Sequence, residues 1–220
     1  MSSPIGINEQ EVMLVDEHDR PLGFLDKLEA HRRWGKLHRA VSVFVFNFQG
    51  ELMMQQRADT KYHSGGLWSN TCCSHPRRNE SVECAAHRCL KEEMGFDCDL
   101  EEMFSFVYSA PVGRGLTERE FDHVLFGTYD GSPRTSPREA KDWKWMAVED
   151  LRADLESNEK QYTTWLRLLF AGELLRRALD IFAGKVNSQS DPALPGANAN
   201  RLSGQGSVPS INRSDRGIRS

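Results

Sequence analysis

Two cysteines and a histidine stand close together in one short segment of this 220-residue sequence. In WSNTCCSHP, residues 68–76, Cys73 follows Cys72 directly and comes two residues before His75. A thiol with an ordinary pKa of about 8.5 can exchange a proton near neutral pH, and an imidazole can do the same or bind a metal ion. The segment is therefore a candidate site for proton transfer or metal chemistry, with Cys73 as its candidate reactive group.

The chain has five cysteines, at positions 72, 73, 84, 89 and 98. Their odd number, and the lack of a basic N-terminal flank followed by an apolar run, favour reduced thiols in a cytoplasmic protein over a disulfide framework. A reduced thiol can fill a core or act as a catalyst. The cysteine count alone does not separate these two roles.

Two glutamates share one face of the strand predicted for GLTEREFDHVLFGTYD, residues 115–130. A period of two puts Glu118, Glu120 and Asp122 on the same side as Val124 and Phe126. If the two apolar residues point into the core, the carboxylates lie at its mouth, where their like charges favour a bound metal ion. On an open strand the same pattern is only a solvated charged face.

Three histidines add possible nitrogen ligands. His31 and His38 precede the first long predicted strand, and His75 follows Cys73. Three imidazoles with two carboxylates suit a divalent transition metal ion, although each histidine taken singly is more often structural. The other histidines are interpreted as structural or surface residues; they are His18, His63, His87 and His123.

A helix predicted from Ser81 to Met94, closed by Gly95, carries a carboxylate on its apolar side. The apolar face runs through Val82, Ala86 and Cys89, and Glu93 is the next position on it. An uncompensated buried carboxylate is costly, so Glu93 should meet a cation or be protonated. The alternative is that Glu93 lies at a frayed helix end and reaches solvent.

A net charge of −4 gives no overall attraction to nucleic acid or to an anionic membrane, so a polyanionic ligand requires a local basic cluster. Lys27, Arg57 and Lys61 are the candidates, the latter two at the end of a predicted strand. A solvated basic surface is the alternative reading of these three. By spacing alone, Tyr108 and Trp165 read as ordinary core residues.

The elements that must position these residues follow an α+β pattern. Strands are predicted over residues 11–16, 40–58 with a hairpin turn at NFQGE, 120–130 and 143–148, and an amphipathic helix over 159–183. The regular alternation of a doubly wound fold is lacking. Residues 1–183 are expected to form one domain, and the Ser-, Asn-, Gly- and Pro-rich residues 184–220 a disordered tail.

The sequence resembles the type 1 isopentenyl-diphosphate isomerase family, whose fold is that of the Nudix hydrolases. The resemblance runs from about residue 10 to residue 170 and includes WSNTCCSHP, EAHRRWGKLHRA, TERE and LKEEMG. It implies a mixed β-sheet packed between helices. It also implies a reversible 1,3-allylic isomerisation of isopentenyl diphosphate to dimethylallyl diphosphate through a carbocation, in isoprenoid precursor biosynthesis.

The general Nudix pattern maps onto this sequence with two departures. It falls on Ser74, Glu80, Arg88, Cys89, Glu92, Glu93 and Gly95. Ser74 replaces the first glycine, and Cys89 replaces a glutamate that is a magnesium ligand in the hydrolases. This loss argues against diphosphate hydrolysis, so a Nudix hydrolase is the second hypothesis and a non-catalytic diphosphate-binding module the third. A flavin-dependent isomerase is disfavoured because no glycine-rich cofactor fingerprint is present.

Carried over residue by residue, the resemblance implies a role for each candidate. One divalent ion, Mn²⁺, Zn²⁺ or Mg²⁺, would be bound by His31, His38, His75, Glu118 and Glu120. Glu93 would help to hold Mg²⁺ on the diphosphate, which would contact Lys27, Arg57 and Lys61. The hydrocarbon pocket would be lined by Tyr108 and Trp165, and the catalytic residues would be the pair Cys73 and Glu120, together with Tyr108. Cys73 is selected over Cys72 because the ligand histidine follows it by two residues. The expected partner is a small diphosphate, with no nucleic acid or membrane, for a monomer or weak homodimer.

Overall fold

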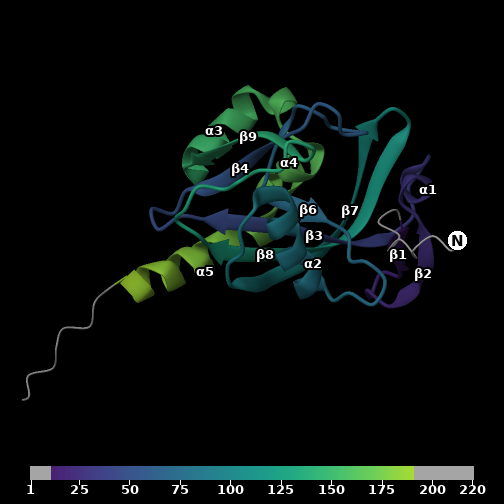
Figure 1. The fold of residues 1–220 in the computed structure, drawn as a ribbon, viewed down its shortest axis with the longest axis horizontal. Helices are drawn as coiled ribbons and strands as arrows, with labels where there is room; N and C mark the ends of the chain where they lie inside the picture. Colours follow the sequence, from purple (N-terminus) through teal and green to yellow (C-terminus); the bar gives the residue numbers. More distant parts are fainter. Residues whose placement is uncertain (1–10, 191–220) are drawn as a thin grey trace, which may run out of the picture.

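The computed structural model describes residues 11–190 of the chain. Its strands are β1 (Glu11–Val15), β2 (Pro21–Asp26), β3 (His38–Phe46), β4 (Leu52–Arg57), β5 (Trp68–Ser69), β6 (Cys72–Ser74), β7 (Leu100–Gly113), β8 (Leu116–Thr128) and β9 (Ala140–Met146). Its helices are α1 (Lys27–His31), α2 (Val82–Cys89), the π-helix η1 (Leu90–Met94), α3 (Val148–Ser157), the 3-10 helix η2 (Glu159–Gln161), α4 (Thr164–Ala171) and α5 (Glu173–Ser190). Figure 1 shows β1, β2 and α1 at one end of the molecule and α5 extending from the other.

The central strand of the sheet is β3. Along one edge it pairs in parallel with β8, from His38 opposite Glu120 to Phe46 opposite Thr128. Its other edge is shared by β1, β6 and β4, all antiparallel. β7 continues the sheet beyond β8, while β5 and β9 pair with β4. This mixed pairing confirms the predicted α+β layout.

The two faces of β3 pack against different helices, because successive side chains of a strand point to opposite sides. Val41, Val43 and Val45 lie in an apolar cluster with α2. Phe44 and Phe46 lie in a second cluster with α4 and α5. Full burial of such a side chain stabilises the fold by about 1.5–3 kcal/mol. The expected sheet packed between helices is confirmed, and the site is built on the second face.

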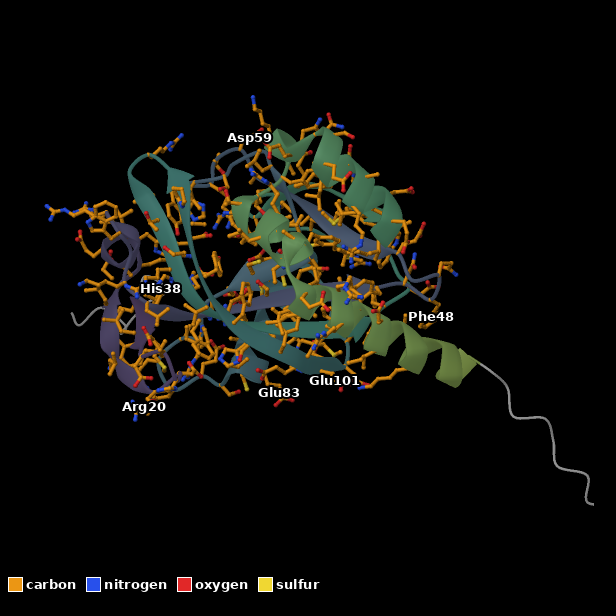
Figure 2. The ribbon with its side chains drawn as sticks, turned by 180° about the vertical axis from the view of Figure 1, so that it is seen from behind. Arg20, His38, Phe48, Asp59, Glu83 and Glu101 are labelled. Carbon is orange, nitrogen blue, oxygen red and sulfur yellow. The ribbon has the colours of Figure 1, made fainter. Side chains whose placement is uncertain are left out.

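The predicted hairpin turn at NFQGE is confirmed between β3 and β4. The Asn47 amide N–H donates to the carbonyl of Glu51 at 2.9 Å, and Gly50 takes a left-handed φ of 79° that favours glycine. Seen from behind in Figure 2, Phe48 of this turn and His38 lie far apart, at the two ends of β3. The His38 end of β3 is therefore the end away from the hairpin.

The helix predicted from Ser81 to Met94 is confirmed, with one feature that the sequence pattern does not predict. Ser81 caps it by accepting the amide N–H of Cys84 at 3.1 Å, and Gly95 closes it with a left-handed φ of 73°. The last turn, η1, is a π-helix. Such turns are rare and occur often at functional sites, and this one carries Glu93.

The single helix predicted over residues 159–183 is wrong. The segment forms η2, an extended stretch at Tyr162 and Thr163, and then α4 and α5, which are separated at Gly172. The Thr163 amide N–H donates to the carbonyl of Trp68 at 2.9 Å, which draws this stretch of chain to the sheet. A long-range backbone bond thus overrides the local helical pattern.

The tail expected from residue 184 begins within a helix, because α5 continues to Ser190. Residues 185–190 contain neither glycine nor proline, so the helix can propagate from its packed part. The remainder of the predicted tail, 191–220, lies outside the described residues. Within residues 11–190, no helix is long and apolar enough to cross a membrane.

Candidate active site and metal centre

A cavity opens where the apolar face of β3 and β8 becomes polar. Along β8, Val124 and Phe126 belong to the apolar cluster, whereas Glu118 and Glu120 on the same face line the cavity. Tyr108 of β7 is paired directly with Glu120, so it lies on that face as well. The predicted period of two along this strand is confirmed, and all five of its inward residues are buried.

Nine of the twelve predicted site residues line this cavity. They are Lys27, Arg57, Lys61, Cys73, His75, Tyr108, Glu118, Glu120 and Trp165. His31 and His38 do not line it but are fully buried beside His75. Glu93 is not among the residues that line the cavity.

The register between β6 and β3 separates the two neighbouring cysteines. Cys73 is paired with Ser42, which is on the cavity face of β3. Cys72 is paired with Val43 and packs on the opposite face with α2. Adjacent residues of a strand point in opposite directions, so only Cys73 can face the cavity.

Asn70 and Ser42 hold the Cys73 thiol. Sγ lies 3.3 Å from Oδ1 of Asn70 and 3.6 Å from Oγ of Ser42. Ser42 donates its single hydroxyl proton to Asp122 at 2.7 Å, so toward the thiol it can act only as an acceptor. Burial and then the Asp122 carboxylate raise the pKa of Cys73 well above its usual value, so the sulfur carries its proton at neutral pH.

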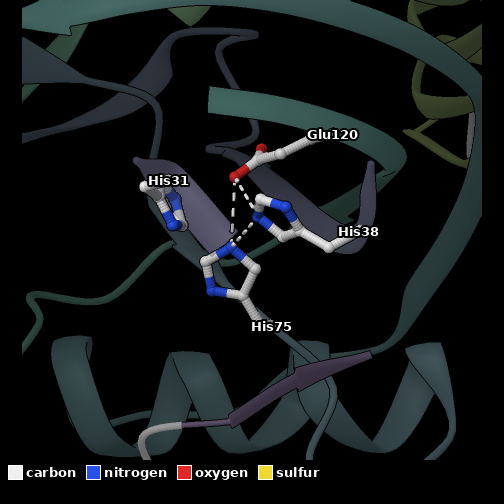
Figure 3. A group of neighbouring side chains, drawn as sticks. All are labelled: His31, His38, His75 and Glu120. Carbon is white, nitrogen blue, oxygen red and sulfur yellow. Dashed lines mark hydrogen bonds and ion pairs between the residues drawn. The ribbon is translucent and has the colours of Figure 1, made fainter. Parts of the chain in front are cut away.

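Four ligand groups converge from α1, from β3, from the loop after β6 and from β8, as Figure 3 shows. His31, His38, His75 and Glu120 each place one nitrogen or oxygen atom within 4.8 Å of the others. Nε2 of His75 is 3.2 Å from Nε2 of His38 and 3.1 Å from Oε1 of Glu120. Three imidazoles and one carboxylate suit a divalent transition metal ion.

Backbone carbonyls fix two of these imidazoles in the form that binds metal ions. Nδ1 of His31 donates to the carbonyl of Lys27 at 2.6 Å, and Nδ1 of His38 donates to that of Lys36 at 2.7 Å. A carbonyl can only accept, so Nδ1 bears the proton and Nε2 keeps its lone pair. Such outer contacts are typical of metal-bound histidines.

The charge states of the histidines fit the same role. Burial, followed by His38, lowers the pKa of His31 to about 4. Burial, followed by Lys27, lowers the pKa of His75 to about 3. Both rings are therefore neutral near pH 7, as a metal ligand must be. The buried Nε2 atom of His31 has no hydrogen-bond partner in the described part of the chain, so the residues present fit a divalent ion.

Glu118 and Glu120 differ in ionisation although they share Tyr108. Burial and then the Glu120 carboxylate raise the pKa of Glu118 well above its usual value. Burial alone would also raise the pKa of Glu120, but the neighbouring His38 and His75 side chains lower it well below its usual value. One carboxyl group thus holds a proton while the other is a carboxylate.

Unpartnered buried atoms gather at this site. Within the part of the chain that the structure describes, four buried side-chain nitrogen or oxygen atoms lack a hydrogen-bond partner, and they belong to His31, Arg57, Tyr62 and Asp122. Each of these residues lines the cavity or contacts a residue that does. Such atoms are rare in folded proteins and require a ligand or a function to account for them.

Three cations line the cavity close enough for their charges to act on one another. Burial, followed by the charges of Lys61 and Arg57, lowers the pKa of Lys27. The Arg57 guanidinium lies 5.1 Å over the Trp165 ring, and Lys61 forms an ion pair with Glu139. A cluster of like charges at a cavity favours a polyanionic ligand such as a diphosphate.

Glu93 points inward from η1, as the helical pattern predicts, and is partly buried there. Gln55 donates to its Oε2 atom at 2.9 Å, and Cys89 lies 3.6 Å from its Oε1 atom. Burial raises the pKa of Glu93, while the charges of Lys61 and Arg57 oppose that rise. Neither of the two groups of candidate metal ligands in residues 11–190 includes Glu93.

The Trp165 indole is tied to the cysteine segment. Its Nε1 atom donates to Oγ of Ser69 at 3.0 Å and lies 3.2 Å from Oδ1 of Asn70. Asn70 therefore lies between the indole and the thiol of Cys73. The sequence interpretation of Trp165 as ordinary core is incomplete, because the ring is both buried in the apolar cluster and exposed to the cavity.

Sequence reasoning missed several residues of the site. Tyr62, His63 and Ser42 line the cavity, and Asn70 contacts Cys73. His63, interpreted from the sequence as a structural or surface residue, is buried with its ring next to that of His31. Its place two residues after the basic segment QQRADTK is a sequence signal that could have pointed to the cavity.

Curated relatives cover most of the chain. It is 56% identical over 158 residues to isopentenyl-diphosphate Delta-isomerase 2 of Aromatoleum aromaticum, covering 72% of this chain and 83% of that protein. It is 46% identical to isopentenyl-diphosphate Delta-isomerase 2 of Photorhabdus laumondii, covering 74% and 92% of the two chains.

Solved structures agree on the fold. The Deinococcus radiodurans protein DR0079 superposes with a TM-score of 0.62 at 23% identity, over 76% of this chain and 98% of that one. The MutT protein of Methanosarcina mazei superposes with a TM-score of 0.52 at 15% identity, over 67% and 95%. The NUDIX domain model matches residues 36–166. The chain therefore belongs to the isopentenyl-diphosphate Delta-isomerase family, whose catalytic domain is a Nudix domain.

Proposed function

We propose that this protein catalyses the reversible 1,3-allylic isomerisation of isopentenyl diphosphate to dimethylallyl diphosphate. One observation carries the proposal: a protonated thiol and an ionised carboxylate line the same cavity as three cations. The reaction adds a proton at one carbon and removes a proton from another. It therefore needs an acid, a base and an anchor for the diphosphate.

Cys73 and Glu120 are the acid and the base in this proposal. They come from β6 and β8, which pair with opposite edges of β3, so the two groups approach a bound substrate from different sides. The raised pKa of Cys73 supplies a proton, and the lowered pKa of Glu120 supplies a proton acceptor. For the reverse reaction the two groups exchange roles, as microscopic reversibility requires.

The carbocation formed on protonation must be kept from water and stabilised. Trp165 and Tyr108 line the cavity and present aromatic surfaces. Attraction between a desolvated cation and an indole contributes about 0.5–2 kcal/mol, which helps without being sufficient alone. The Glu120 carboxylate adds a negative charge on the side from which a proton leaves.

Lys27, Arg57 and Lys61 would bind the diphosphate, with Mg²⁺ held against it by Glu93. The site formed by His31, His38, His75 and Glu120, together with Glu118, would hold a second divalent ion, Mn²⁺, Zn²⁺ or Mg²⁺. When bound, that ion would supply positive charge beside the two carboxylates and so favour their ionised forms. Glu118 would then lose the proton that its raised pKa otherwise retains.

The expected setting is a cytoplasmic enzyme that supplies isoprenoid precursors as a monomer or weak homodimer. The described part of the chain has no helix long and apolar enough to span a membrane, which is compatible with that setting. A small diphosphate is its substrate class.

The test is incubation of the purified chain with isopentenyl diphosphate and Mg²⁺, followed by chromatographic separation of the products. Dimethylallyl diphosphate is the expected product, formed until the two isomers reach a constant ratio. Release of phosphate with loss of the diphosphate would identify a Nudix hydrolase. Tight binding of an unchanged substrate would identify a diphosphate-binding module, and either result would overturn the proposal.

A further inference from the structure

A second group of possible metal ligands lies beside the first. His63 and Glu118 each place a nitrogen or oxygen atom within 4.8 Å of the other and of His31, and all three residues are buried. His31 is common to both groups. His63 belongs to the loop between β4 and β5 and has no part in the reaction proposed above.

The His63 ring turns one nitrogen toward this group. Its Nδ1 atom lies 3.2 Å from Oγ of Ser64, while its Nε2 atom lies 3.5 Å from Oε1 of Glu118. The ring stacks on that of His31, with centroids 6.0 Å apart and planes at 28°. The Trp165 ring meets the His63 ring edge to face, with their centroids 6.0 Å apart. Packing thus fixes the ring with Nε2 directed inward.

His31 limits what the two groups can hold together. Its Nδ1 atom is committed to the carbonyl of Lys27, so Nε2 offers one lone pair, and that buried atom has no hydrogen-bond partner among residues 11–190. One lone pair binds one ion. The two groups cannot each bind an ion through His31 at the same time.

We propose that His63 is a further ligand of the divalent ion at this centre, which gives one ion two overlapping positions. The first position uses His38, His75 and Glu120 with His31, and the second uses His63 and Glu118 with His31. This inference rests on the metal centre of the proposed function and extends it. Two imidazoles and one carboxylate favour ions such as Zn²⁺, Mn²⁺ or Co²⁺ over Mg²⁺, which prefers oxygen ligands.

The second position has a consequence for the reaction. An ion at His31, His63 and Glu118 leaves Glu120 outside the ligand set. The Glu120 carboxylate then does not have to hold the ion and exchange a proton simultaneously. His63 is therefore a residue that affects both metal affinity and the availability of the base.

The test is a titration of the full chain, freed of metal by a chelator and kept free of diphosphate, with Co²⁺ as the probe. Calorimetry gives affinity and stoichiometry, and visible absorption reports the ligands of the ion. His63→Leu removes the nitrogen while roughly keeping the volume. His87→Leu is the matched control, since His87 pairs with Asp97 away from the cavity.

The expected result for His63→Leu is an affinity lower by about tenfold or more, an altered Co²⁺ spectrum, and an unchanged stoichiometry. His87→Leu should match the unmodified chain in all three. Thermal unfolding of the metal-free proteins checks folding; if His63→Leu is unfolded, His63→Gln replaces it with the same expectation. Unchanged affinity and spectrum in the folded variant would overturn the proposal.

A third variant, His31→Leu, separates this inference from the metal centre itself. It should abolish binding of one ion per chain. Loss of two ions would mean two separate sites and would also overturn the shared position. Retention of full binding would instead refute the metal centre, and the product assay with isopentenyl diphosphate tests the isomerase reaction independently of both.

Discussion

The phenol of Tyr108 lies 2.6 Å from Oε2 of Glu120, its direct neighbour across the pair of β7 and β8. The phenol oxygen of Tyr108 also lies 3.0 Å from Oε2 of Glu118. A phenol has one proton and can donate to only one of the two. Because the pKa of Glu118 is raised, Glu118 carries its own proton and the Tyr108 proton goes to Glu120.

Replacement Tyr108→Phe should slow turnover and shift its dependence on pH. A hydrogen bond to a charged group contributes about 1.5–3 kcal/mol, which corresponds to roughly 10- to 100-fold in rate. A donor favours the ionised carboxylate, so its loss raises the pKa of Glu120. The acidic limb of the rate profile should therefore move to higher pH. An acidic limb that stays in place while the rate falls would contradict this role for the hydroxyl.

Replacement of Cys73 and of its neighbour Cys72 by alanine should have different effects on turnover. Cys73→Ala should reduce turnover by about 10²- to 10⁴-fold, the range for loss of a general acid. Cys72→Ala should retain most of the activity, because Cys72 packs against α2 on the opposite face, but it should lower the free energy of unfolding. Steady-state kinetics and urea unfolding of both variants measure this. The reverse ranking of the two activities would refute the assignment.

The sequence suffices for features that depend on local geometry. The period of two along β8 puts Glu118 and Glu120 beside the core without any knowledge of their neighbours. The helical spacing to Glu93 likewise predicts an inward carboxylate, and the structure has one. The choice of Cys73 over Cys72 needed the family resemblance, whereas the register with Ser42 and Val43 explains it physically.

Features that depend on long-range pairing could not be predicted. Asn70 is held by contacts with the carbonyl of Val43 and the indole of Trp165, and both residues are far from it in the sequence. His63 enters the site only because its loop folds back over Arg57. The sequence pattern predicts none of β2, β7, α1 and α3, and β2 contains only exposed and half-buried residues.

Asn70 should be a positioning residue for the thiol and the indole. Its Nδ2 atom donates to the carbonyls of Val43 and Cys72, which fixes Oδ1 toward Cys73. Asn70→Ala should lower kcat by about tenfold or more and change KM far less, while Asn70→Asp should restore part of kcat because it retains the oxygen acceptor.

Asn47 provides the control for Asn70, since it is a buried asparagine of a turn far from the cavity. Asn47→Ala should lower the free energy of unfolding and leave kcat of the folded protein unchanged. Equal losses of kcat in both alanine variants would show that Asn70 has only a structural effect.

The pairing of Glu80 with Arg88 should appear in the dependence of stability on pH. Burial opposes ionisation of Glu80, but hydrogen bonds from Arg88, at 2.8 and 2.9 Å, and from the Arg77 amide lower its pKa. A lowered folded pKa means that the folded state binds fewer protons than the unfolded state. The contribution of ionised Glu80 to the free energy of unfolding is fully present above the unfolded pKa of about 4.3. It is lost as the pH falls through the pKa of the folded state.

Glu80→Gln cannot ionise and lacks that contribution at every pH. Its deficit in the free energy of unfolding relative to the unmodified chain should be largest near neutral pH and should shrink below about pH 4. Urea unfolding at a series of pH values measures the deficit. A deficit that is constant across the series would contradict the pairing as its source.

The central claim is that Cys73 and Glu120 move protons to and from an allylic diphosphate, and heavy water tests it most directly. Incubated with isopentenyl diphosphate and Mg²⁺ in heavy water, the unmodified chain should yield dimethylallyl diphosphate that contains deuterium, identified by mass spectrometry and NMR. Cys73→Ala should yield little of this product, and Cys72→Ala should yield most of it. Dimethylallyl diphosphate without deuterium, or equal incorporation by Cys73→Ala, would contradict the account.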